Sequence, residues 1–119
     1  MKTICDANII LRYLIHDDDE LYNYALKIIE KSPYVSLLVL SEVVYVLKGV
    51  YKIPKTEIVD SLMAISEEVQ YEENELVMKT LENYKELNLD FVDCYLLARN
   101  QMNNDKVITF DKKLDSKFE

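Results

Sequence analysis

Three acidic residues lie where apolar runs end or helical patterns begin, and a fourth lies inside an apolar helical pattern; carboxylates at such positions can do chemistry. The four residues are Asp6, Glu42, Asp93 and Asp111. Carboxylate oxygens are hard ligands that suit Mg²⁺ or Mn²⁺. A cluster of them can hold one or two such ions, activate a water and steady the leaving oxygen during in-line attack on a phosphodiester. The pattern therefore predicts a metal-dependent site for phosphodiester hydrolysis.

Asp6 follows a short apolar run, residues 3–5, that is long enough for a buried strand. Apolar residues resume at helical spacing directly after Asn8, so the chain changes from strand to helix around Asp6. An acid at such a junction lies at the carboxyl edge of a sheet, where open α/β folds bind ligands. The alternative is that Asp6 or Asn8 only caps the helix, since Asp and Asn are preferred capping residues.

Asp111 repeats the arrangement of Asp6 near the end of the chain. It directly follows residues 106–110, whose apolar and β-branched composition predicts another strand. Strands that alternate with helices form parallel βαβ units with right-handed crossovers, so their carboxyl ends share one edge of the sheet. The sequence therefore predicts an α/β fold in which Asp6 and Asp111 converge.

Glu42 lies in the middle of residues 37–51, a helical pattern that is apolar nearly all round. A buried glutamate is costly unless it is paired or binds a metal, so we expect Glu42 to be functional. The alternative is a glutamate that faces solvent between Ser41 and Val43.

Two acids begin the helical pattern at residues 90–98. Asp90 is in the capping position and Asp93 is in the first turn, where a helix N-terminus favours negative charge for stability alone. Because Asp90 is better explained as a cap, we assign Asp93 as the third acid of the site and Asp90 as a possible additional one.

The rest of the sequence predicts helices and strands that carry no candidate catalytic residue. An acidic run, residues 17–20, is expected to begin a helix of about three turns. His16, just before it, is expected in an exposed loop. The remaining expected elements are a strand at residues 34–36, a helix opened by Pro54, a short edge strand at 69–71 and a helix at 73–87.

Composition limits the function classes. The chain has 119 residues, half of them apolar, which predicts one domain over residues 1–119. It lacks a long apolar window and a signal-peptide pattern, so we expect a cytoplasmic protein. The net charge of −8 should repel nucleic acid unless bound cations reverse the sign locally. A single glycine excludes P-loop and GxGxxG phosphate sites, and Cys5 and Cys94 are expected as buried thiols.

Four stretches together resemble the blocks of a PIN domain, and the nearest branch resembles the VapC-type toxins of bacterial toxin–antitoxin pairs. They are residues 6–14, 40–43, 90–98 and 109–111. The resemblance implies a three-layer α/β/α domain with a central parallel β-sheet and a Mg²⁺- or Mn²⁺-dependent ribonuclease site. It also implies products with 5′-phosphate and 3′-hydroxyl ends, a homodimer, and inhibition by a cognate antitoxin that occupies the site.

Residue by residue, the resemblance places the catalytic and metal-binding acids at Asp6, Glu42, Asp93 and Asp111, with Asn8, Thr109 and Asp90 as accessory polar positions. The function that follows is a metal-dependent endoribonuclease, as the toxin of a type II pair. The alternatives are a catalytically silent PIN-like interaction module and an RNA-processing nuclease that is not a toxin. Candidate RNA contacts, each otherwise a solvated surface charge, are Arg12, Lys48, Lys52, Arg99, Lys112 and Lys113.

Overall fold

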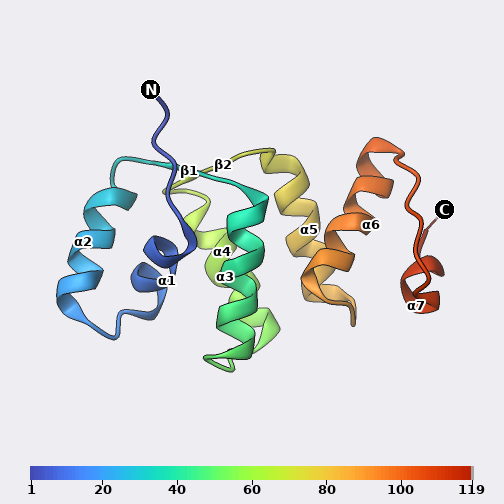
Figure 1. Ribbon diagram of the computed structural model, residues 1–119, viewed down its shortest axis with the longest axis horizontal. Coiled ribbons are helices and arrows are strands. Elements are labelled where there is room, and N and C mark those ends of the chain that lie inside the picture. The colour runs from blue at the N-terminus through green and yellow to red at the C-terminus, as the bar shows by residue number, and fades with distance from the viewer. Residues whose placement is uncertain (119) are drawn as a thin grey trace. The chain divides into compact units, whose positions relative to one another are not determined.

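The computed structural model describes residues 1–118, and it divides the chain into two compact units, residues 1–73 and residue 74 onward (Figure 1). The chain is mostly helical and contains a small parallel sheet. The predicted α/β class therefore agrees with the structure, although helices make up far more of it than strands do.

The first unit contains three short parallel segments. Strands β1 (Tyr34–Val35) and β2 (Gln70–Tyr71) pair in parallel, with Tyr34 opposite Gln70. On the other side of β1, Ile4 forms a parallel bridge with Tyr34. The segments at residues 3–5, 34–36 and 69–71 thus meet in parallel, as predicted, but residues 3–5 form only the bridge at Ile4, which is 61% exposed, so the buried strand expected there is wrong.

Four helices complete the first unit: α1 (Ala7–Ile15), α2 (Asp19–Ile29), α3 (Leu37–Gly49) and α4 (Lys55–Ile65). Helix α1 packs against α2 and α3, and α3 packs against α4. Their inward faces are aliphatic, and Ile10, Leu40 and Leu62 are fully buried. Apolar residues at helical spacing explain this packing, because each helix must bury one apolar stripe.

The second unit is built on α5 (Asn74–Glu86) and α6 (Phe91–Asn103), which pack closely along their length. Tyr84 and Phe91 meet edge to face, with ring centroids 5.6 Å apart. The buried amide of Asn83 donates hydrogen bonds to the Cys94 carbonyl (3.3 Å) and to Gln101 Oε1 (2.9 Å). A short helix, α7 (Lys112–Asp115), follows, and Leu114 is its buried residue.

The strand predicted at residues 106–110 is wrong, because the structure has no strand there. Val107 and Thr109 are half-buried whereas Ile108 and Phe110 are exposed, so the alternation expected of a strand is present without a paired neighbour. Strand propensity describes the segment itself, whereas pairing depends on a partner distant in sequence. Figure 1 shows this segment returning from the end of α6 to α7.

Left-handed backbone occurs at five described residues, and none of them is glycine. His16 and Asn104 end α1 and α6 in this conformation and donate their N–H groups back to the helix. The others are Ser32, Lys52 and Glu73. The only glycine, Gly49, is helical, and a Cβ placed on it would meet no atom of the described residues within 4 Å.

Candidate active site

Asp6 lies where the N-terminal segment leaves the small sheet. The N–H of the preceding residue, Cys5, donates to the Tyr34 carbonyl at 3.3 Å, and α1 begins one residue after Asp6. Asp6 Oδ1 accepts the N–H of Ile9 at 3.3 Å, so Asp6 caps the helix as well. The side chains of Asp6 and Asn8 are exposed, which leaves the second carboxylate oxygen of Asp6 open to solvent.

Glu42 is exposed, and the expectation that it is buried is wrong. Its helix buries Leu40, Val43 and Val44, whereas Leu38 and Tyr45 are 83% and 76% exposed. Apolar composition around the whole helix therefore does not mean burial around the whole helix. Glu42 lies on the exposed face, between two large apolar side chains.

At the start of α6 the two acids have different roles. Asp90 has extended backbone and its Oδ1 accepts the N–H of Asp93 at 3.0 Å, so it is the helix cap. Asp93 is half-buried, and this burial raises the pKa of its carboxyl group. The negative charges of Asp90 and Asp111 raise the same pKa further.

Asp111 is held by a local turn. Its N–H donates to Thr109 Oγ1 at 3.0 Å, and its Oδ1 accepts the N–H of Leu114 at 3.0 Å. Leu114 is 1% exposed and anchors α7. Thr109 therefore orients the backbone of Asp111, and α7 fixes its carboxylate. The structure brings Asp111 within electrostatic reach of Asp93 in the second unit.

Sequence reasoning did not foresee α7 or the ion pair at the other end of α6. The spacing from Asp111 to Leu114 is a capping signal followed by an apolar anchor, so it could have indicated this short helix. Arg99 donates to Asp105 Oδ2 at 2.6 Å and to the Tyr95 hydroxyl at 2.9 Å. These contacts fix the turn from which the chain returns toward Asp111.

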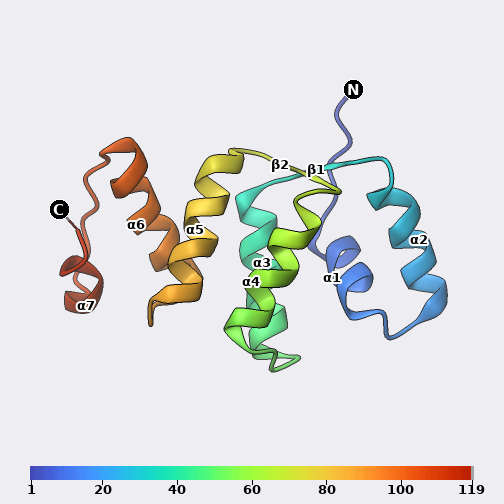
Figure 2. The ribbon, with the colours of Figure 1, turned by 180° about the vertical axis from the view of Figure 1, so that it is seen from behind.

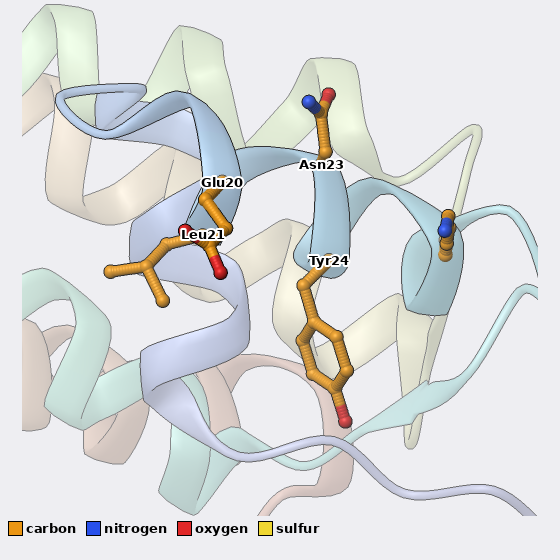
Figure 3. Close-up of a pocket in the computed structure, with 5 residues that line it drawn as sticks. Glu20, Leu21, Asn23 and Tyr24 are labelled. Carbon is orange, nitrogen blue, oxygen red and sulfur yellow. The ribbon is translucent and has the colours of Figure 1, made fainter.

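A hollow lies along α2, and none of the predicted site acids lines it (Figure 3). Its lining residues are Glu20, Leu21, Asn23, Tyr24 and Lys27. Glu20 is the only acid among them, so this hollow cannot supply a carboxylate cluster. The adjoining acidic run behaves as predicted, because Asp18 caps α2 and Asp19 and Glu20 occupy its first turn.

Each unit contributes two of the four predicted acids, Asp6 and Glu42 in the first and Asp93 and Asp111 in the second. Within either unit, residues 1–118 contain no group of three or more acidic, cysteine or histidine side chains with the geometry of a metal site. Cys5 and Cys94 are buried free thiols, as predicted. In the same described range, no helix is both long and apolar enough to cross a membrane.

The family model of the PIN domain matches residues 3–117. The chain belongs to the PIN domain family. PIN domains have an α/β fold and are generally nucleases that need divalent metal ions. No curated protein matches the sequence.

Proposed function

We propose that this PIN domain is a Mg²⁺- or Mn²⁺-dependent endoribonuclease that hydrolyses RNA phosphodiester bonds. The observation that carries the proposal is the arrangement of acids in the second unit. Asp93 is half-buried, which raises the pKa of its carboxyl group, and the negative charges of Asp90 and Asp111 raise that pKa further. Carboxylates that share a small region without a compensating cation repel one another, and a bound divalent cation removes that repulsion.

The donor set fits a hard divalent cation. Asp6, Glu42, Asp93 and Asp111 offer only carboxylate oxygens, which Mg²⁺ and Mn²⁺ prefer. When bound, such an ion polarises a phosphoryl oxygen and lowers the pKa of water. In this proposal the four carboxylates hold the ions, and Thr109 keeps Asp111 in position through its backbone N–H.

Asp93 rather than Asp90 is the third ligand in this proposal. The Asp90 carboxylate is engaged by the N–H of Asp93, as expected of a helix cap. Asp93 lies in the first turn of α6, and its carboxylate does not cap the helix. Asp90 then acts as an accessory acid, and Asn8 on α1 is the corresponding accessory polar group near Asp6.

We further propose the toxin role and the finer architecture that the resemblance to VapC-type proteins implies. The fold is a three-layer α/β/α arrangement with a central parallel sheet, supported by the three parallel segments of the first unit. The protein forms a homodimer in the cytoplasm, and a cognate antitoxin occupies its site. Induced expression should then arrest growth, and co-expression of a cognate antitoxin should relieve the arrest.

Cleavage of total RNA by the purified protein tests the nuclease. The reaction is run with Mn²⁺, with Mg²⁺ and with EDTA, beside Asp6→Asn and Glu42→Gln variants. We expect cleavage with either metal, no cleavage in EDTA, and loss of cleavage in both variants. Undiminished cleavage by folded Asp6→Asn protein would contradict the assignment of the site. Absence of cleavage with every metal would favour a silent interaction module.

A further inference from the structure

The distribution of charge along the chain has one conspicuous exception. Residues 1–73 contain seven Lys and Arg against thirteen Asp and Glu, a net charge of −6. Between Glu42 and Glu57 there is no acid for 14 residues, the longest such stretch in the sequence. Its charged residues are Lys48, Lys52 and Lys55. The most acidic part of the protein therefore contains its longest purely basic segment.

This segment forms the second half of α3 and the turn into α4. Figures 1 and 2 show the turn at the end of the α3–α4 pair opposite β1 and β2. Large side chains are exposed there: Tyr45 is 76% exposed and Val50 is 67% exposed. Tyr51 and the left-handed Lys52 are also exposed. We call Tyr45, Lys48, Val50, Tyr51 and Lys52 the Tyr45 surface.

The Tyr45 surface adjoins Glu42 on the same helix. Residues 38, 42, 45 and 49 follow the spacing of one face of an α-helix, and all four are exposed. Tyr45 is therefore the next side chain along the face from Glu42. Gly49 comes one turn later and leaves open space beside Tyr45. At about 1.5 Å per residue, the end of α3 lies about 10 Å beyond Glu42.

We propose that the Tyr45 surface binds single-stranded RNA and leads it to the acid at Glu42. Tyr45 and Tyr51 stack on bases, and Lys52 contacts the phosphates. Exposed aromatic rings beside cations are the usual means of binding single strands without reading their sequence. The inference rests on the proposed nuclease function, because the bound strand is the substrate of the site to which Glu42 is assigned.

Charge and shape favour RNA over a protein partner. A docked amphipathic helix needs a continuous apolar stripe, but the exposed face of α3 is interrupted by Glu42 and by Gly49. Lys52 offers an exposed cation to a polyanion, and the open space at Gly49 can accommodate a planar base beside Tyr45. An acidic peptide would satisfy the lysines and leave the tyrosine rings exposed to solvent.

Helix α2 provides a matched control surface. Tyr24 is 62% exposed and Lys27 is exposed, so α2 presents the same two residue types in the same unit. Glu20 shares their hollow, and the acidic run 17–20 precedes it. Local negative charge should repel a phosphate chain from this surface. The two surfaces therefore differ in charge setting while sharing residue types.

Binding is measured without cleavage, by fluorescence anisotropy of a labelled oligouridylate of about twelve nucleotides in EDTA. We compare Tyr45→Ala and Lys52→Ala with the control variants Tyr24→Ala and Lys27→Ala, and check the helix content of each by circular dichroism. We expect Tyr45→Ala to weaken binding about 5- to 150-fold, the range for a lost base stack. Tyr45→Phe, which keeps an aromatic ring, should retain most of the affinity.

The salt dependence separates stacking from charge. Lys52→Ala should lower the slope of log affinity against log salt by about 0.7, the value for one phosphate contact on a single strand. Tyr45→Ala should leave that slope unchanged. The two control variants on α2 should change neither the affinity nor the slope.

Three results would overturn the proposal: unchanged affinity in folded Tyr45→Ala and Lys52→Ala proteins, equal losses in the α2 variants, or binding of a polyglutamate peptide in place of RNA. The last result would identify the partner as an acidic protein. Failure here is distinguishable from failure of the nuclease, which is tested by cleavage with metal in the Asp6→Asn protein. RNA binding without cleavage would support RNA binding by the Tyr45 surface and would contradict only the proposed nuclease activity.

Discussion

Helices α1 and α6 begin alike, yet the acid assigned to catalysis occupies a different position in each. In α1 it is Asp6, which is itself the cap and accepts the N–H of Ile9. In α6 the cap is Asp90, and the assigned acid, Asp93, lies in the first turn. One carboxylate serves two purposes at α1, whereas α6 divides them between two residues.

Placing the cap and the assigned acid on separate residues at α6 has an electrostatic consequence for Asp93. Burial of the Asp93 carboxyl raises its pKa most, and the negative charges of Asp90 and Asp111 raise that pKa further. A capping role at these helices is therefore compatible with the metal-binding role that we propose. The same preference of helix N-termini for negative charge stabilises the helix and supplies acids where a cation can bind.

The largest expected effect comes from Asp6→Asn. Asparagine caps a helix about as well as aspartate, so the free energy of unfolding should change by only a few tenths of a kcal/mol. Cleavage should fall at least about 100-fold because an amide is a poorer ligand for a hard cation. The measurement pairs RNA cleavage with thermal melting. Asp6→Ala serves as the control: it should lose activity equally and about 1 kcal/mol of stability besides.

At α6 the same two effects should fall on different residues. Asp90→Ala removes the cap and should cost about 1 kcal/mol of stability while most cleavage remains. Asp93→Asn should abolish cleavage with little loss of stability. Urea denaturation and the cleavage assay measure both quantities. If Asp90→Ala abolished cleavage and Asp93→Asn did not, Asp90 would replace Asp93 as the ligand.

The two helices are also held differently beyond their first turns, and Tyr13→Phe tests this for α1. The Tyr13 hydroxyl donates to Glu68 at 2.7 Å, which ties α1 to the segment before β2, whereas α6 is held by the Asn83 amide of α5 and by its local pair of Arg99 and Asp105. Because the site is largely exposed, the loss should be at most about 1 kcal/mol. Denaturation of wild type and variant at neutral pH measures it.

The same contact gives a pH dependence with a definite sign. The hydrogen bond to Glu68 raises the pKa of Tyr13 from 10.0 to about 12. The stability it provides is therefore complete below pH 10 and is lost as the pH rises through about 12. The Tyr13→Phe protein should lack this part of the alkaline loss. Equal pH profiles for the two proteins would contradict the assignment.

The smallest effect concerns the metal-free protein. Because the folded-state pKa of Asp93 is raised above 3.8, its contribution to stability is complete below that pH and is lost as pH rises through the folded value. Asp90→Asn removes one of the charges responsible, so NMR titration should give a lower pKa for Asp93. Asp115→Asn, which changes an acid not among the causes of this shift, is the matched control.

Local signals in the sequence predicted most of the helices. Residues 73–87 were expected as a helix, and the structure has Asn74–Glu86. The few residues that follow Asp6, Asp18 and Asp90 indicate that each of these acids caps a helix. These features depend on contacts within one or two turns, which the sequence displays directly.

Features that depend on contacts between residues distant in sequence were predicted less well. Residues 106–110 have strand composition but form no strand, because pairing requires a neighbour that composition does not specify. Glu42 was expected to be buried because its helix is apolar, yet tertiary packing decides which side of such a helix faces the core. The exposure of Tyr45 escaped prediction for the same reason. The assignment of the four acids rests on the family pattern and stays a prediction.

Lys52 shows how stability and function can oppose each other at one residue. It adopts a left-handed conformation with φ of 58° at the tip of the α3–α4 turn, where glycine would relieve a strain of about 1 kcal/mol. Selection for folding alone would favour glycine at this position. A Lys52→Gly protein should therefore melt at a higher temperature and hold RNA less tightly, so that the two properties respond in opposite directions to one substitution.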